Sequence, residues 1–562
     1  MLRSTRSKAR DNDPATDHDP DAGRTGVDMA VFIPAGGLAL GFVLWGALKP
    51  ASLASVAAGS MELISANFGW FFILATNGFL VFAIYLAMSR FGSIRLGRDG
   101  ERPEFRTVSW ISMMFAAGIG IGLIFYGVAE PMSHLMSPPP GTAEAGTEQA
   151  ARVAMNQTFL HWGLHGWAIY AVAGLGMAYF GFRKGQGNLI SSACRPVIGS
   201  RCDGPLGKLI DGMAVFATLF GVVPSLGLGA VQINSAMTSL WGIESSTSIA
   251  LVIVFAMAAA MVLSAVTGVK RGVQFLANVA MVTSVILAVF VLVAGPTRHI
   301  ADSMVESFGG YVTQIVPMSI RTGTFSQGEF VNGWTVAYWV WWIAWAPFVG
   351  AFIARISRGR TIKEFVWGVL LMPSGVSFVW FVIFGGSAMH AQVTGQADIA
   401  ARVAESQANA LFALLDQYPA AKLVTFVVMF LVALFFVSGM DAAAVVMGIL
   451  SSRGALTPPR WVVVFWGVAT GGAAAVLLVA GGLDAMQQAM LVMAAPFTLV
   501  MIVLCVGVMR ALREEVPAGG AEAAPPAARH RDDAGVAPVV TDRDTVPHEQ
   551  ASTAALEPEV AR

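Results

Sequence analysis

Apolar runs, each about 20 residues long, follow one another from Met29 to about residue 509 of this 562-residue sequence. A helix of about 20 apolar residues crosses the hydrocarbon core of a bilayer. Backbone groups cannot stay unpaired in lipid, and the runs are too long for the strands of a barrel. The sequence therefore predicts an all-α membrane protein. We expect twelve transmembrane helices, near residues 29–48, 68–88, 108–128, 158–181, 209–240, 248–266, 272–295, 333–355, 364–386, 421–450, 460–480 and 485–509.

The composition excludes several classes of protein. Only 12% of the residues are charged and 56% are hydrophobic, whereas soluble domains carry about 25% charged residues. The formal net charge is zero, so nothing favours a nucleic-acid partner. Three cysteines, Cys194, Cys202 and Cys505, are too few for a disulfide framework or a cysteine metal site. We expect one membrane domain in contact with lipid, without an organic cofactor.

The two ends of the chain differ from its middle. Residues 1–27 are polar and lack the apolar core of a cleavable signal, and residues 512–562 are rich in alanine, proline and charge. We therefore expect two tails, the second of them disordered, around a twelve-helix domain at 28–511. Most lysines and arginines fall in loops after even-numbered spans, such as 89–107 and 182–208. By the positive-inside rule, both tails face the cytoplasm from a multi-pass protein of the cell inner membrane.

Residues 116–122 read Ala-Ala-Gly-Ile-Gly-Ile-Gly inside the expected third span. Each glycine costs a helix about 1 kcal/mol relative to alanine, yet it lets the backbone leave helical geometry and approach a ligand closely. A broken helix at membrane depth is tolerated where it lines a cavity. Gly118 and Gly122 also form a small-xxx-small pair, which is typical of close helix packing. The spacing alone leaves both interpretations open.

An aromatic stripe runs along the expected eighth span. Its members lie at helical spacings of 3, 4 or 7 and are Trp334, Tyr338, Trp341, Trp342 and Trp345. The fourth span adds Trp162, Trp167 and Tyr170. An interfacial aromatic belt would explain Trp334, but not tryptophans two to three turns further inward. Because a quaternary ammonium has no N–H donor, it is held by π faces and dispersion, so the stripe favours a ligand of this class.

Two histidines, His161 and His165, stand at i and i+4 on the fourth span, a spacing that could hold a metal. No glutamate or cysteine accompanies them on that helix face, so we interpret them as helix-packing residues and expect no metal site. Nor does the sequence indicate a cluster of Asp, Glu, His or Cys within the spans. Such residues are costly in a membrane and mark function where they occur. Their absence argues against a membrane-embedded enzyme.

Two segments resemble the betaine/carnitine/choline transporter family. They are residues 118–134, with Gly-Val-Ala-Glu-Pro at 127–131, and residues 334–360, which end in Ala-Arg-Ile-Ser-Arg-Gly-Arg. The similarity extends over about residues 29–510. It implies a fold of twelve helices. Two extra helices precede a LeuT-like 5+5 inverted repeat, in which two five-helix units have opposite orientations in the membrane. Members of this family often assemble as trimers, so the resemblance also implies a homotrimer.

The same resemblance implies a binding site for a small solute. It places Trp162, Trp167, Tyr170 and Trp342 in a central aromatic box, with Trp341 and Trp345 along the path toward the cytoplasm. Backbone groups around Ala117 and Ile119 would meet the carboxylate region of the substrate. Gly120 and Gly122 complete the expected substrate-binding set. Proton-coupled choline members of the family carry an aspartate where this chain has Gly122, and glycine there accompanies sodium-coupled betaine uptake.

Two cation sites of sodium-coupled family members map onto this chain in weakened form. The first uses carbonyls that match Ala116 and Ile119 and two hydroxyls that match Ser438 and Gly439, so one hydroxyl is missing. The second uses two threonines and a phenylalanine. These positions are Thr218, Val222 and Phe348 here, so a second oxygen is missing. Hard cations need several oxygen ligands.

The resemblance therefore implies a secondary active transporter that imports glycine betaine or a related quaternary-ammonium or zwitterionic compatible solute. Cation symport is expected, with sodium ahead of protons as the coupling ion. The alternatives are an ion-independent exchanger and a proton symporter of choline, carnitine or ectoine. The expected partners are the small-molecule substrate, membrane lipid and further copies of the chain.

Overall fold

The computed structural model describes residues 26–516 except 119, 268–269 and 327, and it leaves out the side chains of 115–119 and 265–274. These described residues are helical and contain no strand, apart from one isolated bridge between Arg95 and Thr361. The first helices are α1 (Met29–Leu48), α2 (Pro50–Met88), α3 (Thr107–Gly118), α4 (Ile121–Met136), α5 (Glu148–Trp162), α6 (Leu164–Ala178), α7 (Ile190–Ala193), α8 (Arg195–Ile198), α9 (Pro205–Trp241) and α10 (Thr247–Thr267). The others are α11 (Lys270–Ala294), α12 (Thr297–Ser319), α13 (Ala337–Ile356), α14 (Ile362–Phe381), α15 (Ser387–Val393), α16 (Ile399–Glu405), α17 (Ala410–Leu415), α18 (Ala421–Leu450), α19 (Arg460–Ala494) and α20 (Phe497–Glu515).

Nine helices in the described part of the chain are long and apolar enough to cross a membrane. The prediction of an all-α multi-pass membrane protein is therefore confirmed, while the arrangement of twelve spans stays a prediction. Three expected spans do not appear as single apolar helices. The spans near 108–128 and 158–181 are each broken in two, and α20 carries charged residues at its end.

Both broken spans are interrupted at glycines. α3 ends at Gly118, and α4 begins at Ile121 after Gly120, whose backbone is extended. Of the two interpretations of the glycine run, the structure therefore shows the broken helix. The second break, at Gly163, separates α5 from α6. A Cβ atom there would lie 2.5 Å from the carbonyl oxygen of Phe159, so only glycine fits this close approach.

Other boundaries also differ from the expected ones. α2 has 39 residues and begins at Pro50, well before the expected span at 68–88. By contrast, α19 consists of two helices that meet at a kink, where the backbone of Gly481 and Gly482 is non-helical, so the expected end of a span near residue 480 matches this break. Hydropathy marks where a run is apolar, but a helix extends as far as backbone hydrogen bonding and packing support it. The expected tails at 1–27 and 512–562 lie mostly outside the described residues.

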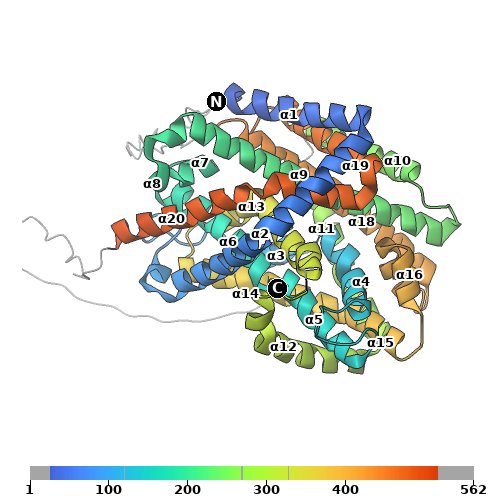
Figure 1. Ribbon diagram of the computed structural model, residues 1–562. Coiled ribbons are helices and arrows are strands. Elements are labelled where there is room, and N and C mark those ends of the chain that lie inside the picture. Colours follow the sequence, from blue (N-terminus) through green and yellow to red (C-terminus); the bar gives the residue numbers. More distant parts are fainter. Residues whose placement is uncertain (1–25, 119, 268–269, 327, 517–562) are drawn as a thin grey trace, which may run out of the picture. The chain divides into compact units, whose positions relative to one another are not determined.

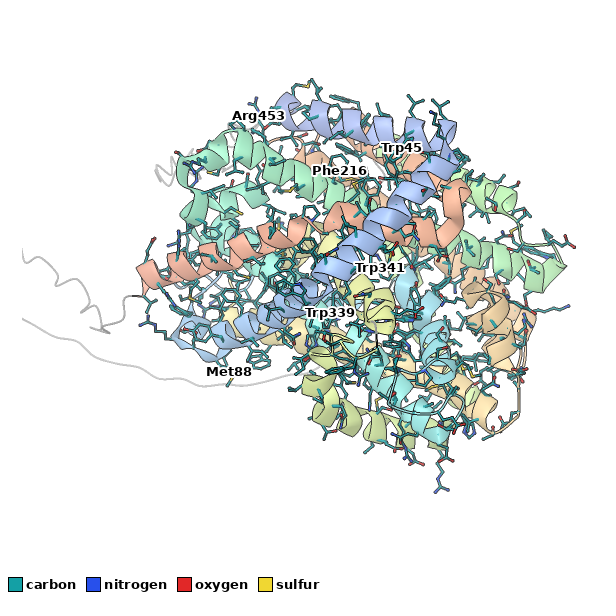
Figure 2. All side chains as sticks on the ribbon, viewed as in Figure 1. Trp45, Met88, Phe216, Trp339, Trp341 and Arg453 are labelled. Atoms are coloured by element: carbon teal, nitrogen blue, oxygen red, sulfur yellow. The ribbon has the colours of Figure 1, made fainter. Side chains whose placement is uncertain are left out.

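Packing brings α9, α13 and α6 together at the centre of the bundle. α9 packs along α18 and α19, while α13 packs along α6 and α9, and α2 crosses over α19 and α6 (Figure 1). α12 lies at one edge of the bundle beside α5 (Figure 1). Figure 2 shows Trp339 and Trp341 inside the bundle and Met88, which is 74% exposed, at its edge. Such exposed apolar side chains suit a surface that faces lipid.

Candidate functional site

One cavity of about 370 Å³ gathers most of the residues that the sequence analysis selected. It lies where the start of α4 meets the end of α5 and parts of α6, α9, α13 and α18. The lining residues with an expected binding role are Gly120, Gly122, Trp162, Trp167, Tyr170, Trp341, Trp342, Trp345, Phe348, Ser438 and Gly439. Segments more than 300 residues apart in the chain therefore face the same space. Their individual roles in binding stay predictions.

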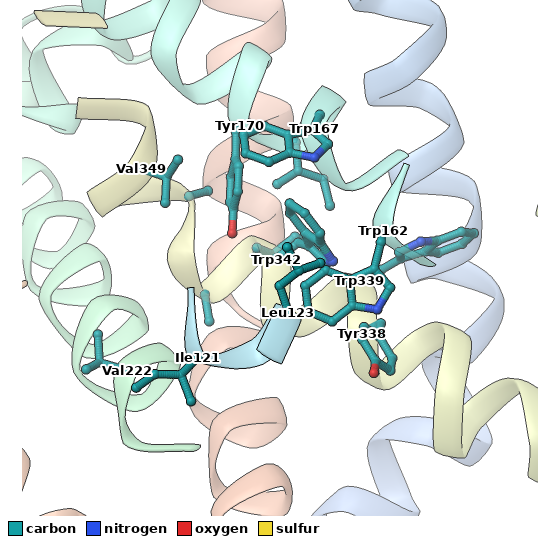
Figure 3. Packing of buried hydrophobic residues seen from close by; sticks show 14 of the residues in the cluster. Ile121, Leu123, Trp162, Trp167, Tyr170, Val222, Tyr338, Trp339, Trp342 and Val349 are labelled. Atoms are coloured by element: carbon teal, nitrogen blue, oxygen red, sulfur yellow. The ribbon is translucent and has the colours of Figure 1, made fainter. Parts of the chain in front are cut away.

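Four aromatic rings form a compact box within this cavity. The ring centroid of Trp342 lies 5.9 Å from that of Trp162, 5.5 Å from that of Trp167 and 4.8 Å from that of Tyr170. Figure 3 shows Trp342 between Tyr170 and Trp167 on one side and Trp162 on the other. Each of these side chains is at most 7% exposed. The box can therefore present π faces to a small cation in the cavity whose wall it forms.

Gly166 determines how Trp342 fits into the box. A Cβ atom on Gly166 would lie 2.5 Å from two atoms of the Trp342 indole, which is too close for real side chains to tolerate. The glycine therefore lets the indole rest directly against the backbone of α6. Gly166 directly precedes Trp167, so the contact between Trp342 and α6 lies next to another member of the box.

The glycines at the start of α4 keep the neighbouring part of the cavity open. A Cβ atom on Gly122 would lie 3.0 Å from the Trp162 ring and 3.1 Å from the Trp341 ring. A Cβ atom on Gly120 would have no atom within 4 Å. Gly122 thus brings two indoles against the helix, whereas Gly120 borders free space. The expected contacts at Ala116, Ala117 and Ile119 cannot be placed, because Ile119 and the other two side chains lie outside the described residues.

The expected cation ligands are only partly brought together. Ser438 and Phe348 line the cavity, as does Val222. The Ser438 hydroxyl donates to the Leu434 carbonyl at 2.9 Å. Thr218 is fully buried one helical turn from Val222 and donates to the Ala214 carbonyl, but it is not among the described residues that line the cavity.

Sequence reasoning missed an acidic side chain beside the box. Glu130 and His134 of α4 and His161 of α5 are fully buried, and their ligating atoms lie within 4.8 Å of one another. The expectation of no acid–histidine cluster was therefore wrong. The search for a glutamate partner of His161 covered only the face of its own helix, whereas Glu130 comes from another helix. Glutamate within an apolar run is costly in a membrane, and that signal was visible at residues 127–131. The contact itself depends on how α4 packs against α5.

A second cavity of about 280 Å³ adjoins the first. Its lining includes Tyr126, Tyr338, Asp484 and Gln487, and the Gln487 amide donates to the Tyr126 hydroxyl at 3.1 Å. Trp341 lines both cavities. Trp341 therefore stands between the two cavities.

Comparison with known proteins adds a family match. The family model described as BCCT, betaine/carnitine/choline family transporter, matches residues 30–517. The glycine betaine transporter OpuD of Bacillus subtilis is 44% identical over 84% of this chain and 92% of its own length. A probable glycine betaine transporter of Desulfitobacterium hafniense is 42% identical over 85% of this chain and 96% of its own length. The ectoine/hydroxyectoine transporter of Virgibacillus pantothenticus is 39% identical over 84% and 93%.

Proposed function

The chain belongs to the betaine/carnitine/choline transporter family, and we propose that it imports glycine betaine or a closely related zwitterionic or quaternary-ammonium solute by secondary active transport. As a member of this family it is a transporter and not an enzyme. The observation that carries the proposal is the box of three indoles and one phenol that lines a single cavity. A trimethylammonium group offers no hydrogen-bond donor, so such a box is the chemistry that recognises it.

A competition experiment tests the substrate class. Uptake of labelled glycine betaine into cells that produce the protein is measured with an excess of unlabelled glycine betaine, choline, carnitine or ectoine. We expect glycine betaine to compete best. Ectoine is the second candidate, because a relative 39% identical to this chain is an ectoine/hydroxyectoine transporter. If labelled betaine does not accumulate and none of the four solutes is taken up, the proposed function is wrong.

The finer features of the transporter are also proposals. We infer an arrangement of twelve helices with both tails in the cytoplasm, supported by the loops rich in lysine and arginine. A homotrimer is proposed from the family resemblance. Sodium is the proposed coupling ion, supported by Ser438 and Phe348 in the cavity wall. Proton symport and ion-independent exchange are the competing mechanisms, because Val222 and Gly439 supply no side-chain oxygen.

Restoring the missing oxygens is expected to strengthen sodium binding. Val222 and Gly439 both line the cavity, and a Cβ atom on Gly439 would have no atom within 4 Å. The double substitution Val222→Thr and Gly439→Ser therefore adds one hydroxyl at each position. The serine at position 439 would enter free space. Since hard cations bind more tightly with more oxygen ligands, we expect the half-saturating sodium concentration to fall on the order of tenfold. Substrate selectivity should not change, because neither residue belongs to the box.

The measurement is uptake into proteoliposomes with sodium replaced by potassium at fixed pH. Gly439→Ala is the matched control, because it adds the same carbon without the hydroxyl. Equal uptake in sodium and potassium, for both the wild type and the double variant, would rule out a sodium role. Proton symport or exchange would then be the mechanism of the same transporter.

A further inference from the structure

Glu130 is a fully buried carboxylate with four hydrogen-bond partners. Its Oε1 atom lies 2.6 Å from Nδ1 of His161 and 3.3 Å from Nε2 of His134. Its Oε2 atom accepts from the Trp162 indole at 2.7 Å and from the Tyr338 hydroxyl at 2.6 Å. An ionised carboxylate has about four lone-pair positions, so these partners match the full capacity of the charged form.

The hydrogen-bond partners of Glu130 act as donors to its carboxylate. Nε2 of His161 lies 3.1 Å from the Gln157 amide nitrogen, which can only donate, and 3.0 Å from the Thr335 hydroxyl, which can donate or accept. Nδ1 of His161, 2.6 Å from Oε1 of Glu130, is the donor of that hydrogen bond, because an ionised carboxylate can only accept. His134 uses only Nε2, since its buried Nδ1 has no partner in the described structure. The two histidines are the basic groups within ion-pair distance of Glu130 in the described structure, and no lysine or arginine there lies that close.

Trp162 connects this charge to the cavity. Its Nε1 edge donates to Glu130, and the opposite end of the indole, Cη2, lies 3.0 Å from where a Cβ of Gly122 would be. The ring thus reaches from the carboxylate to the wall of the box. Donation of an N–H to an anion shifts electron density onto the donor ring. A ring with more electron density, backed by a negative charge, attracts a cation on its face more strongly.

A purely structural role does not require a charge here. A glutamine would have a similar shape, and burying an ionised group in the interior of a membrane protein costs several kcal/mol. The ammonium group of a solute in the adjoining box would bring a further positive charge toward Glu130 and compensate part of this cost. Asp484 lines the neighbouring cavity rather than this one, and His134 and His161 face the carboxylate as donors.

We propose that Glu130 is a specificity-determining residue, which acts through Trp162 to make the box select a positively charged ammonium group over an uncharged group of the same shape. The proposal rests on the proposed function of the cavity as an ammonium-binding site. Glu130 acts through Trp162 rather than by touching the solute, so it is also a positioning residue for that indole.

The test compares Glu130→Gln, which removes the charge, with Glu130→Asp, which keeps it. Binding of glycine betaine and of 3,3-dimethylbutanoate, its uncharged-headgroup carbon isostere, is measured by tryptophan fluorescence of the purified full-length protein. We expect Glu130→Gln to weaken betaine binding at least about tenfold, with the isostere unaffected. Glu130→Asp should keep most of the betaine affinity. Glu62→Gln, at an exposed position of α2, is the control for handling and expression.

Two results would overturn the proposal. Equal losses of betaine affinity in the Gln and Asp variants would mean that Glu130 only holds Trp162 in place. Unchanged betaine affinity in the Gln variant would mean that the charge does not reach the box. If the wild type binds betaine, either of these results leaves the proposed function intact. If the wild type binds no ammonium solute, the proposed function itself is contradicted. Size-exclusion chromatography of each variant separates loss of binding from loss of folding.

Discussion

Trp342→Ala is expected to abolish high-affinity uptake while the protein remains folded. The indole contacts the other three members of the box, and it rests against Gly166. Alanine would remove the π face that all three share and open the space to water. A desolvated cation–π contact is worth about 2 kcal/mol, which corresponds to a rise of about 30-fold in the half-saturating concentration. Loss of the box geometry should increase this effect.

The measurement is the concentration dependence of betaine uptake, normalised to protein in the membrane. Trp241→Ala is a matched control, because that indole is 55% exposed at the end of α9. Trp342→Phe retains an aromatic face and should recover part of the affinity. Truncation of a buried tryptophan also costs about 3–5 kcal/mol of stability, so thermal unfolding of the purified variant must be followed. Unchanged half-saturation in a folded alanine variant would show that the box lies elsewhere.

Gly120→Leu is expected to block transport more than it lowers the amount of folded protein. Gly120 lines the cavity, and a Cβ atom on this residue would have no atom within 4 Å. A leucine side chain can therefore enter the space without clashing, but it fills volume that the solute needs. If Gly120 served helix packing instead, the substitution would reduce assembly, and the surviving protein would keep its specific activity.

Uptake per unit of membrane protein distinguishes these two outcomes. Gly375→Leu is the matched control, because Gly375 is an exposed position of α14 with no atom within 4 Å of a Cβ. We expect that control to transport normally. A Gly120→Leu protein with wild-type specific activity and low abundance would contradict the cavity role.

Local properties of the sequence predicted the class of fold and the character of the site. Long apolar runs predict membrane helices, since lipid leaves the backbone no alternative. The spacing of Trp341, Trp342 and Trp345 predicts an aromatic helix face because helical periodicity is a local property. The family resemblance, now confirmed by the match over residues 30–517, brought Trp162, Trp167 and Tyr170 into the same hypothesis.

Tertiary packing decided which residues from distant parts of the chain meet, and the spacing of residues along the chain does not contain this information. The break at Gly163 depends on how closely Phe159 and Phe378 approach it, and these contacts come from the fold. Thr218 lies outside the lining of the cavity although Val222, one turn away, is part of it. Residues four apart lie on the same side of a helix, so the two positions differ in depth along α9, and the helices that pack at each turn decide how far along α9 the cavity extends.

Glu130 illustrates the same division most clearly. The sequence by itself determined that a carboxylate stands in an apolar segment, where its cost indicates function. Only the tertiary structure decided which groups satisfy it, because His161 and Trp162 follow about 30 residues later and Tyr338 more than 200 residues later. Hydrogen bonds between helices depend on distances of a few tenths of an ångström, and such distances are fixed by packing rather than by the order of residues.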